Sequence, residues 1–287
     1  MRSITQNSTT LVAAPFLLAG IFLFLSLPPH TAAQPKPLPT WNLVNSAEPQ
    51  PIAPGVAYIK KSIAVSDSDS AFNRNKTLHL ITFNNRVATL KVIDQGDDPR
   101  DPPYDDLADA MQQNFCVAGC NGGFFTEDFA PGGLVITSGQ AIGSFTTHSL
   151  YAGTILVSSD GALALLWNDE TKITPDIAHL IQAGPRLVLE GKPKTVFGWE
   201  PHRNRTFILT DGEENWAIGL CTKISLSDLA VVLANPKIIS EVNVQRALNL
   251  DGGTSSSLYF SRGAGKRPFE FNGFKPVVRN YLGITKR

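Results

Sequence analysis

The chain has 287 residues, of which 43% are hydrophobic and 17% charged, a balance that suits one large folded domain or two small ones and excludes a disordered chain. Lys and Arg total 25, and Asp and Glu also total 25, so the formal net charge is zero. A neutral chain has no overall field to draw it onto nucleic acid or an anionic membrane, and we expect no nucleic-acid partner. An anionic ligand must therefore be held locally, by a few arginines and backbone amides.

The first 33 residues have the pattern of an export signal. Arg2 supplies the positive start, Leu11 to Leu27 is apolar except for one serine, and Thr31 to Ala33 offers small residues before a cleavage point. We expect residues 1–33 to be a signal peptide and the mature protein to be periplasmic or extracellular. The alternative is an uncleaved membrane anchor with the body facing outside, although the apolar run is slightly short for a spanning helix and contains Pro15.

The next segment, residues 34–55, is rich in proline. Closely spaced prolines favour an extended, semi-rigid spacer, so the sequence predicts a linker here and a folded domain over residues 56–287. The prolines of this segment are Pro35, Pro37, Pro39, Pro49, Pro51 and Pro54.

Strand patterns outnumber helix patterns in the body. Residues 77–83 and 86–93 are rich in β-formers and flank Asn84-Asn85, which predicts a hairpin. Residues 105–114 and 225–234 predict the helices, the second with Ser225 as its cap. The fold class we expect is α+β, a single strand-rich domain with a mixed or antiparallel sheet and a few helices. Further strands are predicted over residues 115–118, 153–157, 162–167, 206–210, 216–221 and 247–250.

The three cysteines, Cys116, Cys120 and Cys221, are too few for a disulfide scaffold. Their apolar neighbours favour buried small hydrophobic residues, and the alternative is one bridge from Cys221 to either of the others after export. Zinc-like spacing is absent from the sequence, so we expect no metal site and no cofactor, with a divalent cation near the acidic residues left open.

Two glycine turns, each directly after an apolar strand, are the strongest candidates for a site. The first is NGGFF at 121–125 and the second is NLDGGTSSS at 249–257. Paired glycines let the backbone bend and expose N–H groups that bind anions, and Asp251 stands beside such a turn as a carboxylate for acid–base chemistry. The alternative is a pair of ordinary β-turns in which Asp251 bonds its own backbone.

Known hydrolase motifs do not explain these turns. The chain contains no GxxxxGK[ST], GxSxG or HExxH motif, and its histidines are scattered, which argues against a serine hydrolase or a zinc peptidase. Arg186 and Arg205, both near turn signals, are candidate phosphate ligands because a guanidinium forms paired hydrogen bonds to phosphate oxygens. Alternatively they are solvated surface arginines.

Several motifs together resemble the phosphodiester glycosidase family. They are NGGFF, GPRLV at 184–188 with Gly191, the pair Arg205-Thr206, ALNLDGG at 247–253 and KPVVRNYLGI at 275–284, and the resemblance extends over the whole body. The chain departs from the family pattern at Thr254, where a third Gly or Ser is common, and at Phe207 and Leu209, where Ala and Gly are common. These changes put the substrate in doubt more than the reaction.

The resemblance implies cleavage between the anomeric carbon of a sugar and a phosphate oxygen, with a sugar-phosphate conjugate or polysaccharide as substrate, in envelope or exopolysaccharide metabolism. It implies Asp251 and Asn121 as catalytic residues. A second carboxylate is open among Glu127, Asp128 and Asp211. The substrate-binding residues implied are Gly122, Gly123, Arg186, Arg205, Gly252, Gly253, Thr254 and Asn280. The runner-up function is a non-catalytic envelope module that binds sugar-phosphate polymer, which needs the arginines and amides but not Asp251.

Overall fold

Antiparallel strands make up most of the structure, a computed structural model that describes residues 38–66, 75–194, 201–274 and 277–287. The largest sheet has its strands in the spatial order β1-β3-β4-β15-β14-β16-β12-β13, and β2 pairs with β3. In chain order these strands are β1 (Trp41–Ser46), β2 (Gln50–Ala53), β3 (Val56–Val65), β4 (Asn75–Asn84), β12 (Arg186–Leu189), β13 (Lys192–Pro193), β14 (Arg203–Thr210), β15 (Asn215–Ile224) and β16 (Arg246–Asn249).

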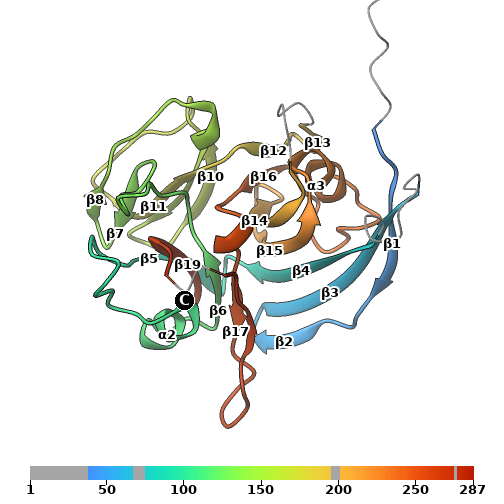
Figure 1. Ribbon diagram of the computed structural model, residues 1–287, viewed down its shortest axis with the longest axis horizontal. Helices are drawn as coiled ribbons and strands as arrows, with labels where there is room; N and C mark the ends of the chain where they lie inside the picture. Colours follow the sequence, from blue (N-terminus) through green and yellow to red (C-terminus); the bar gives the residue numbers. More distant parts are fainter. Residues whose placement is uncertain (1–37, 67–74, 195–200, 275–276) are drawn as a thin grey trace, which may run out of the picture. The chain divides into compact units, whose positions relative to one another are not determined.

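Two five-stranded sheets complete the strand framework (Figure 1). One runs in the order β10-β9-β11-β7-β8 and contains β7 (Val135–Thr137), β8 (Gln140–Ile142), β9 (Gly153–Ser158), β10 (Leu163–Trp167) and β11 (Ile177–Ala183). The other runs β18-β17-β6-β19-β5 and contains β5 (Ala88–Asp94), β6 (Ala118–Asn121), β17 (Leu258–Phe260), β18 (Phe269–Phe271) and β19 (Asn280–Lys286). All pairings among these strands are antiparallel. The expected strand-rich α+β fold is confirmed, with antiparallel sheets.

Helices are short in the described part of the chain. They are α2 (Leu107–Gln113) and α3 (Leu226–Leu233), with single 3-10 turns η1 (Ser149–Tyr151) and η2 (Gly253–Ser255). Both α-helices occur where the sequence predicts them, and the Ser225 hydroxyl accepts a bond from the Asp228 amide as the expected cap. Neither helix is long and apolar enough to cross a membrane.

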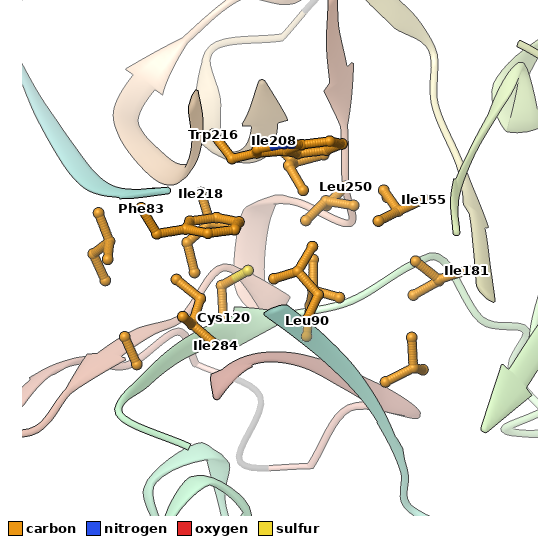
Figure 2. Packing of buried hydrophobic residues seen from close by; sticks show 14 of the residues in the cluster. Phe83, Leu90, Cys120, Ile155, Ile181, Ile208, Trp216, Ile218, Leu250 and Ile284 are labelled. Atoms are coloured by element: carbon orange, nitrogen blue, oxygen red, sulfur yellow. The ribbon is translucent and has the colours of Figure 1, made fainter. Parts of the chain in front are cut away.

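The main hydrophobic core lies among the three sheets (Figure 2). It takes Ile208 from the largest sheet, Cys120 and Leu90 from the sheet of β6, and Ile155 from the sheet of β9, all fully buried or nearly so. The opposite face of the largest sheet is covered by α3, which packs against Phe207 and other residues that alternate with those of the main core. Strand β14 is therefore apolar on both faces.

The three cysteines are buried and free, as the apolar neighbourhood indicated. Burial raises the pKa of Cys116 to about 11 and that of Cys221 to about 12, so both remain protonated at neutral pH.

The linker prediction for residues 34–55 is wrong over most of its length. Strands β1 and β2 both pair with β3, and Trp41 is only 4% exposed. The Trp41 indole donates to Asp228 Oδ1 at 3.1 Å, which ties the start of the body to α3. Pro51 fits this arrangement because β2 is an edge strand, where a missing amide leaves no pairing unfilled, and Pro49 precedes the strand. Residues 34–37 and the predicted signal peptide lie outside the described residues.

The predicted hairpin around Asn84-Asn85 is also wrong. A turn is present, with the Val87 amide donating to the Asn84 carbonyl at 3.2 Å. However, β4 pairs with β3 and β15, whereas β5 pairs with β19 in another sheet. The turn therefore passes the chain from one sheet to the next.

The anchoring of β1 can be tested by Trp41→Ala. Loss of a buried indole should lower the free energy of unfolding by roughly 3–5 kcal/mol, because a cavity is left and its hydrogen bond is lost. Denaturant unfolding measures this, with Val44→Ala on the same strand as control, since Val44 is 63% exposed. Equal stability of the two variants would contradict the placement of β1 in the folded body.

Candidate functional site

The two glycine turns meet where the sheet of β6 joins the largest sheet. The Asp251 amide donates to the Gly122 carbonyl at 3.0 Å, and Asn121 Nδ2 donates to the Asp251 carbonyl at 2.7 Å. Cys120 and Leu250, the residues just before Asn121 and Asp251, are both in the main core (Figure 2). The hydrophobic packing therefore fixes the two turns against each other.

Asn121 is completely buried, and both of its polar side-chain atoms are bonded within the protein. Its Oδ1 accepts from the Thr206 hydroxyl at 2.8 Å and from the Ser257 amide at 3.0 Å. Its Nδ2 donates to Asp251 and, at 3.4 Å, to the Gly122 carbonyl. A carboxamide has two donors and two acceptor sites, so these bonds occupy all of them. In this structure Asn121 positions the site, and its predicted catalytic role stays a prediction.

Asn280 and the paired glycines form a second close contact. The Gly123 amide donates to Asn280 Oδ1 at 2.8 Å, and a Cβ on Gly122 would come within 2.0 Å of the same oxygen. A residue with a side chain at position 122 would therefore clash with Asn280. Asn280 is only 1% exposed, and among the described residues its Nδ2 has no hydrogen-bond partner. The neighbouring Arg279 is buried, forms a two-bonded ion pair with Asp94 and donates to the Phe129 carbonyl, which holds the loop after NGGFF.

Asp251 and its turn lie beside two arginines. Asp251 is partly exposed, and its Oδ1 accepts from the Gly252 amide at 2.8 Å. A Cβ on Gly252 would lie 3.6 Å from Arg205 Cδ, and one on Gly253, whose φ is 65°, would lie 3.5 Å from Arg203 Cδ. The guanidinium of Arg205 donates to the carbonyls of Pro201 and Ile224. The turn thus combines one carboxylate with two cationic side chains.

Arg186 lines a cavity of about 670 Å³, and the cavity residue Pro185 is bonded to Asn249, just before this turn. Its guanidinium lies 4.8 Å from the centre of the Trp167 ring and donates to the Ala152 carbonyl and to Asp169. The cavity mixes cationic, polar and apolar groups, which suits a sugar with a phosphate. Its lining residues are Thr147, Ser149, Leu150, Ala152, Asn168, Asp169, Pro185, Arg186, Lys194 and Leu226.

Backbone contacts join the cavity to the Asp251 turn. The Pro185 carbonyl accepts from the Asn249 amide at 3.1 Å, and Asn249 Nδ2 donates to the Gly184 carbonyl at 2.9 Å. Tyr151 stands in the chain between Leu150 and Ala152, which both line the cavity. Burial and then the charge of Asp251 raise the pKa of the Tyr151 phenol, so it stays protonated and able to donate at neutral pH.

The remaining predicted residues lie in different parts of the structure. Thr254 is exposed. Its carbonyl oxygen is so near Gly273 that a Cβ added to that glycine would lie 2.1 Å from it. Glu127 and Asp128 are exposed on the loop after NGGFF. Asp211 caps the turn between β14 and β15, accepting from the Glu213 and Asn215 amides. That turn is at the opposite end of β14 from Arg205, so Asp211 is not the partner of Asp251.

Four residues at or near the site had not been predicted from the sequence: Tyr151, Asp169, Lys194 and Arg203. Tyr151 and Asp169 stand in no motif, and only the folding of the 147–152 segment against Gly132 and Gln182 brings Tyr151 to the site. Arg203 could have been predicted from the sequence, because it stands two residues before Arg205 on one strand and such residues share a face.

A family model described as phosphodiester glycosidase matches residues 114–285, which include both glycine turns and the arginines. The chain belongs to the phosphodiester glycosidase family. An Escherichia coli K12 relative, the uncharacterized protein YigE, is 28% identical over 178 residues, which are 55% of this chain and 63% of that protein. The match thus spans less than two thirds of that relative.

Solved structures share the fold. The catalytic domain of zebrafish N-acetylglucosamine-1-phosphodiester alpha-N-acetylglucosaminidase, auto-inhibited by its pro-peptide, aligns with a TM-score of 0.57 at 17% identity, covering 86% of this chain and 89% of that one. A hypothetical protein from Synechocystis aligns with a TM-score of 0.53 at 14% identity, covering 82% and 63% respectively. At these identities the likeness shows the fold.

The central place of Asn121 can be tested by Asn121→Ala. The change leaves the buried Ser257 amide and Thr206 hydroxyl without their acceptor, so the free energy of unfolding should fall by roughly 1–3 kcal/mol for each group left unpaired. Denaturant unfolding measures the loss, with Asn42→Ala as the control because the Asn42 side chain bonds only at the exposed surface. A loss no larger than that of the control would show that the two turns do not depend on this side chain.

Proposed function

We propose that this protein is an exported hydrolase that cleaves the anomeric carbon–oxygen bond of a sugar phosphodiester and releases the sugar and a phosphomonoester, in envelope or exopolysaccharide metabolism. The observation that carries the proposal is the position of Asp251, held on the glycine turn beside Arg203 and Arg205 and next to the cavity that contains Arg186. Family membership and the likeness to the zebrafish glycosidase domain support the same reaction class.

The chemistry requires a phosphate to be held and a sugar cation to be stabilised. Water attacks the anomeric carbon and releases one proton to the solvent. The bond from that carbon to the bridging oxygen breaks, and its electrons remain on the phosphate, which leaves as a monoester. This leaving group is acidic and needs little help from a general acid. The larger need is electrostatic stabilisation of positive charge on the ring, which suits the Asp251 carboxylate.

The cationic groups of the site suit the phosphate. Arg186 and Lys194 line the cavity, and Arg203 and Arg205 flank the turn, so the negative charge that builds on the leaving oxygen is met from nearby protein groups. Tyr151 adds a neutral donor, with a phenol whose pKa is raised by burial and by the charge of Asp251. Export rests on the sequence pattern of residues 1–33.

The role of Asp251 is tested by Asp251→Asn. Asparagine keeps an oxygen that accepts from the Gly252 amide, so the thermal midpoint should change little. Turnover should fall by about a hundred- to a thousand-fold, because the charge that stabilises the sugar cation is lost. Turnover and Michaelis constant are measured on methyl phosphodiesters of α-N-acetylglucosamine and α-glucose, by release of reducing sugar. Asp176→Asn, at an exposed loop position, is the matched control.

Two results count against the proposal in different ways. Near-normal turnover in the Asp251 variant of an active parent reduces Asp251 to a turn residue. A parent that binds these phosphodiesters but releases no sugar from any of them makes the non-catalytic binding module the better function.

Tyr151→Phe tests the neighbouring phenol separately. The ring contacts with Phe124 and Gly132 remain, so stability should be unchanged. Loss of one uncharged hydrogen bond to the substrate should lower kcat/KM by about two- to tenfold, corresponding to roughly 0.5–1.5 kcal/mol. The same kcat/KM for parent and variant would remove Tyr151 from the site.

A further inference from the structure

A hairpin remote from the glycine turns carries a cluster of cationic side chains. Between β17 and β18 the chain reads SRGAGKRP over residues 261–268, with Arg262, Lys266 and Arg267 all exposed and no acidic residue. We call residues 261–268 the basic tip. In Figure 1 it extends from β17 away from the remaining strands. In a chain whose net charge is zero, three cations within eight residues form a strong local field.

The base of the hairpin is held by aromatic packing. The rings of Phe260 and Phe269 stack at 4.9 Å, and Tyr58 of β3 stacks on Phe260 at 4.4 Å. The Arg262 guanidinium lies 5.8 Å from the Phe260 ring centre and 5.9 Å from that of Phe269. This packing presents the tip on a fixed stem, and a charged surface that is already ordered loses less entropy on binding.

The charges of the basic tip are not neutralised by neighbouring acids. Among the described residues, no ion pair involves Arg262, Lys266 or Arg267. The acidic residue on the stem, Glu270, accepts from the Asn272 amide group and pairs across the strands with Tyr259. Lys60, exposed on the same face of β3 as Tyr58, adds a further cation near the stem.

Strand register places the basic tip away from the candidate active site. Leu258 lies opposite Cys120, and Phe260 lies opposite Ala118, so β17 runs from the Asn121 end of β6 toward its other end. An extended chain rises about 3.3 Å per residue, which puts the middle of the tip on the order of 20 Å from Ser257. A ligand that reached both places would need several repeat units.

We propose that the basic tip is a second binding site, which takes the phosphates of a phosphodiester-linked polymer at a distance from the catalytic turn. Two guanidinium groups and one ammonium suit phosphate oxygens. An anionic membrane fits less well, because a membrane-binding loop needs large apolar residues to insert and this tip offers glycine and alanine. Bases of nucleic acid would need exposed aromatic rings for stacking, which the tip also lacks. The identity of the polymer as a substrate rests on the proposed function, whereas the binding does not.

The test uses a triple variant, Arg262→Gln, Lys266→Gln and Arg267→Gln, in the full chain. Its matched control, Lys172→Gln, Lys237→Gln and Lys286→Gln, removes the same charge at exposed positions elsewhere. Binding of fluorescently labelled long-chain inorganic polyphosphate is measured at several salt concentrations, alongside vesicles containing phosphatidylglycerol. Hydrolysis of the small methyl phosphodiesters is measured in parallel.

The triple variant should bind polyphosphate about tenfold or more weakly than the parent, and its slope of log Kd against log salt should be smaller by about 2, since each lost phosphate contact contributes about 0.7. The control variant should match the parent, and both should hydrolyse the small substrates as the parent does. Equal polyphosphate binding by the two variants, or a loss confined to vesicle binding, would overturn the proposal. An inactive parent that shows the expected binding pattern would instead count against the proposed catalysis alone.

Discussion

The Asn121 side chain is the contact on which the rest of the site depends. It bonds to the chain at Asp251, Thr206 and Ser257, so one carboxamide connects the end of β6, the strand β14 and the segment before β17. These bonds are buried, where a polar group left without its partner is costly, and they therefore specify one arrangement of the two glycine turns. The position of the Asp251 carboxylate follows from this arrangement.

Gly122 and Asn280 illustrate how closely the same junction is packed. A side chain on Gly122 would occupy the place of the Asn280 oxygen, which already accepts from the Gly123 amide. Gly122 of NGGFF is thus explained by the approach of β19, whereas a Cβ on Gly123 would lie 3.2 Å from the Gln182 carbonyl of β11. An anion-binding role for their amides is an additional hypothesis, since the Gly123 amide is already bonded.

Under the proposed function, local placement of charge lets a neutral protein bind an anionic substrate. Arg186 is held by Trp167, Asp169 and a backbone carbonyl, and Arg205 by two backbone carbonyls. Side chains fixed in this way are ordered before a ligand arrives, which reduces the entropy lost on binding. The basic tip adds a separate cationic surface on the hairpin that follows the Asp251 turn.

The sequence alone determined the class of structure and the residues around which the site is built, because these depend on short patterns. Runs of β-forming residues marked the central strands, Ser225 marked the start of α3, and strands ending in paired glycines marked the turns at Asn121 and Asp251. Only the tertiary structure decided which strands pair. Asn84-Asn85 has the local chemistry of a hairpin turn, yet β5 leaves for another sheet because its partner β19 is at the far end of the chain.

The same limit applies to the side chains of the site. Trp41 joins the core, Asp211 is separated from Asp251, and Tyr151 packs against Gly132. Each of these placements depends on contacts between residues that are apart in the sequence. Local patterns carry no information on such contacts, because they depend on the packing of whole sheets rather than on the spacing of neighbouring residues.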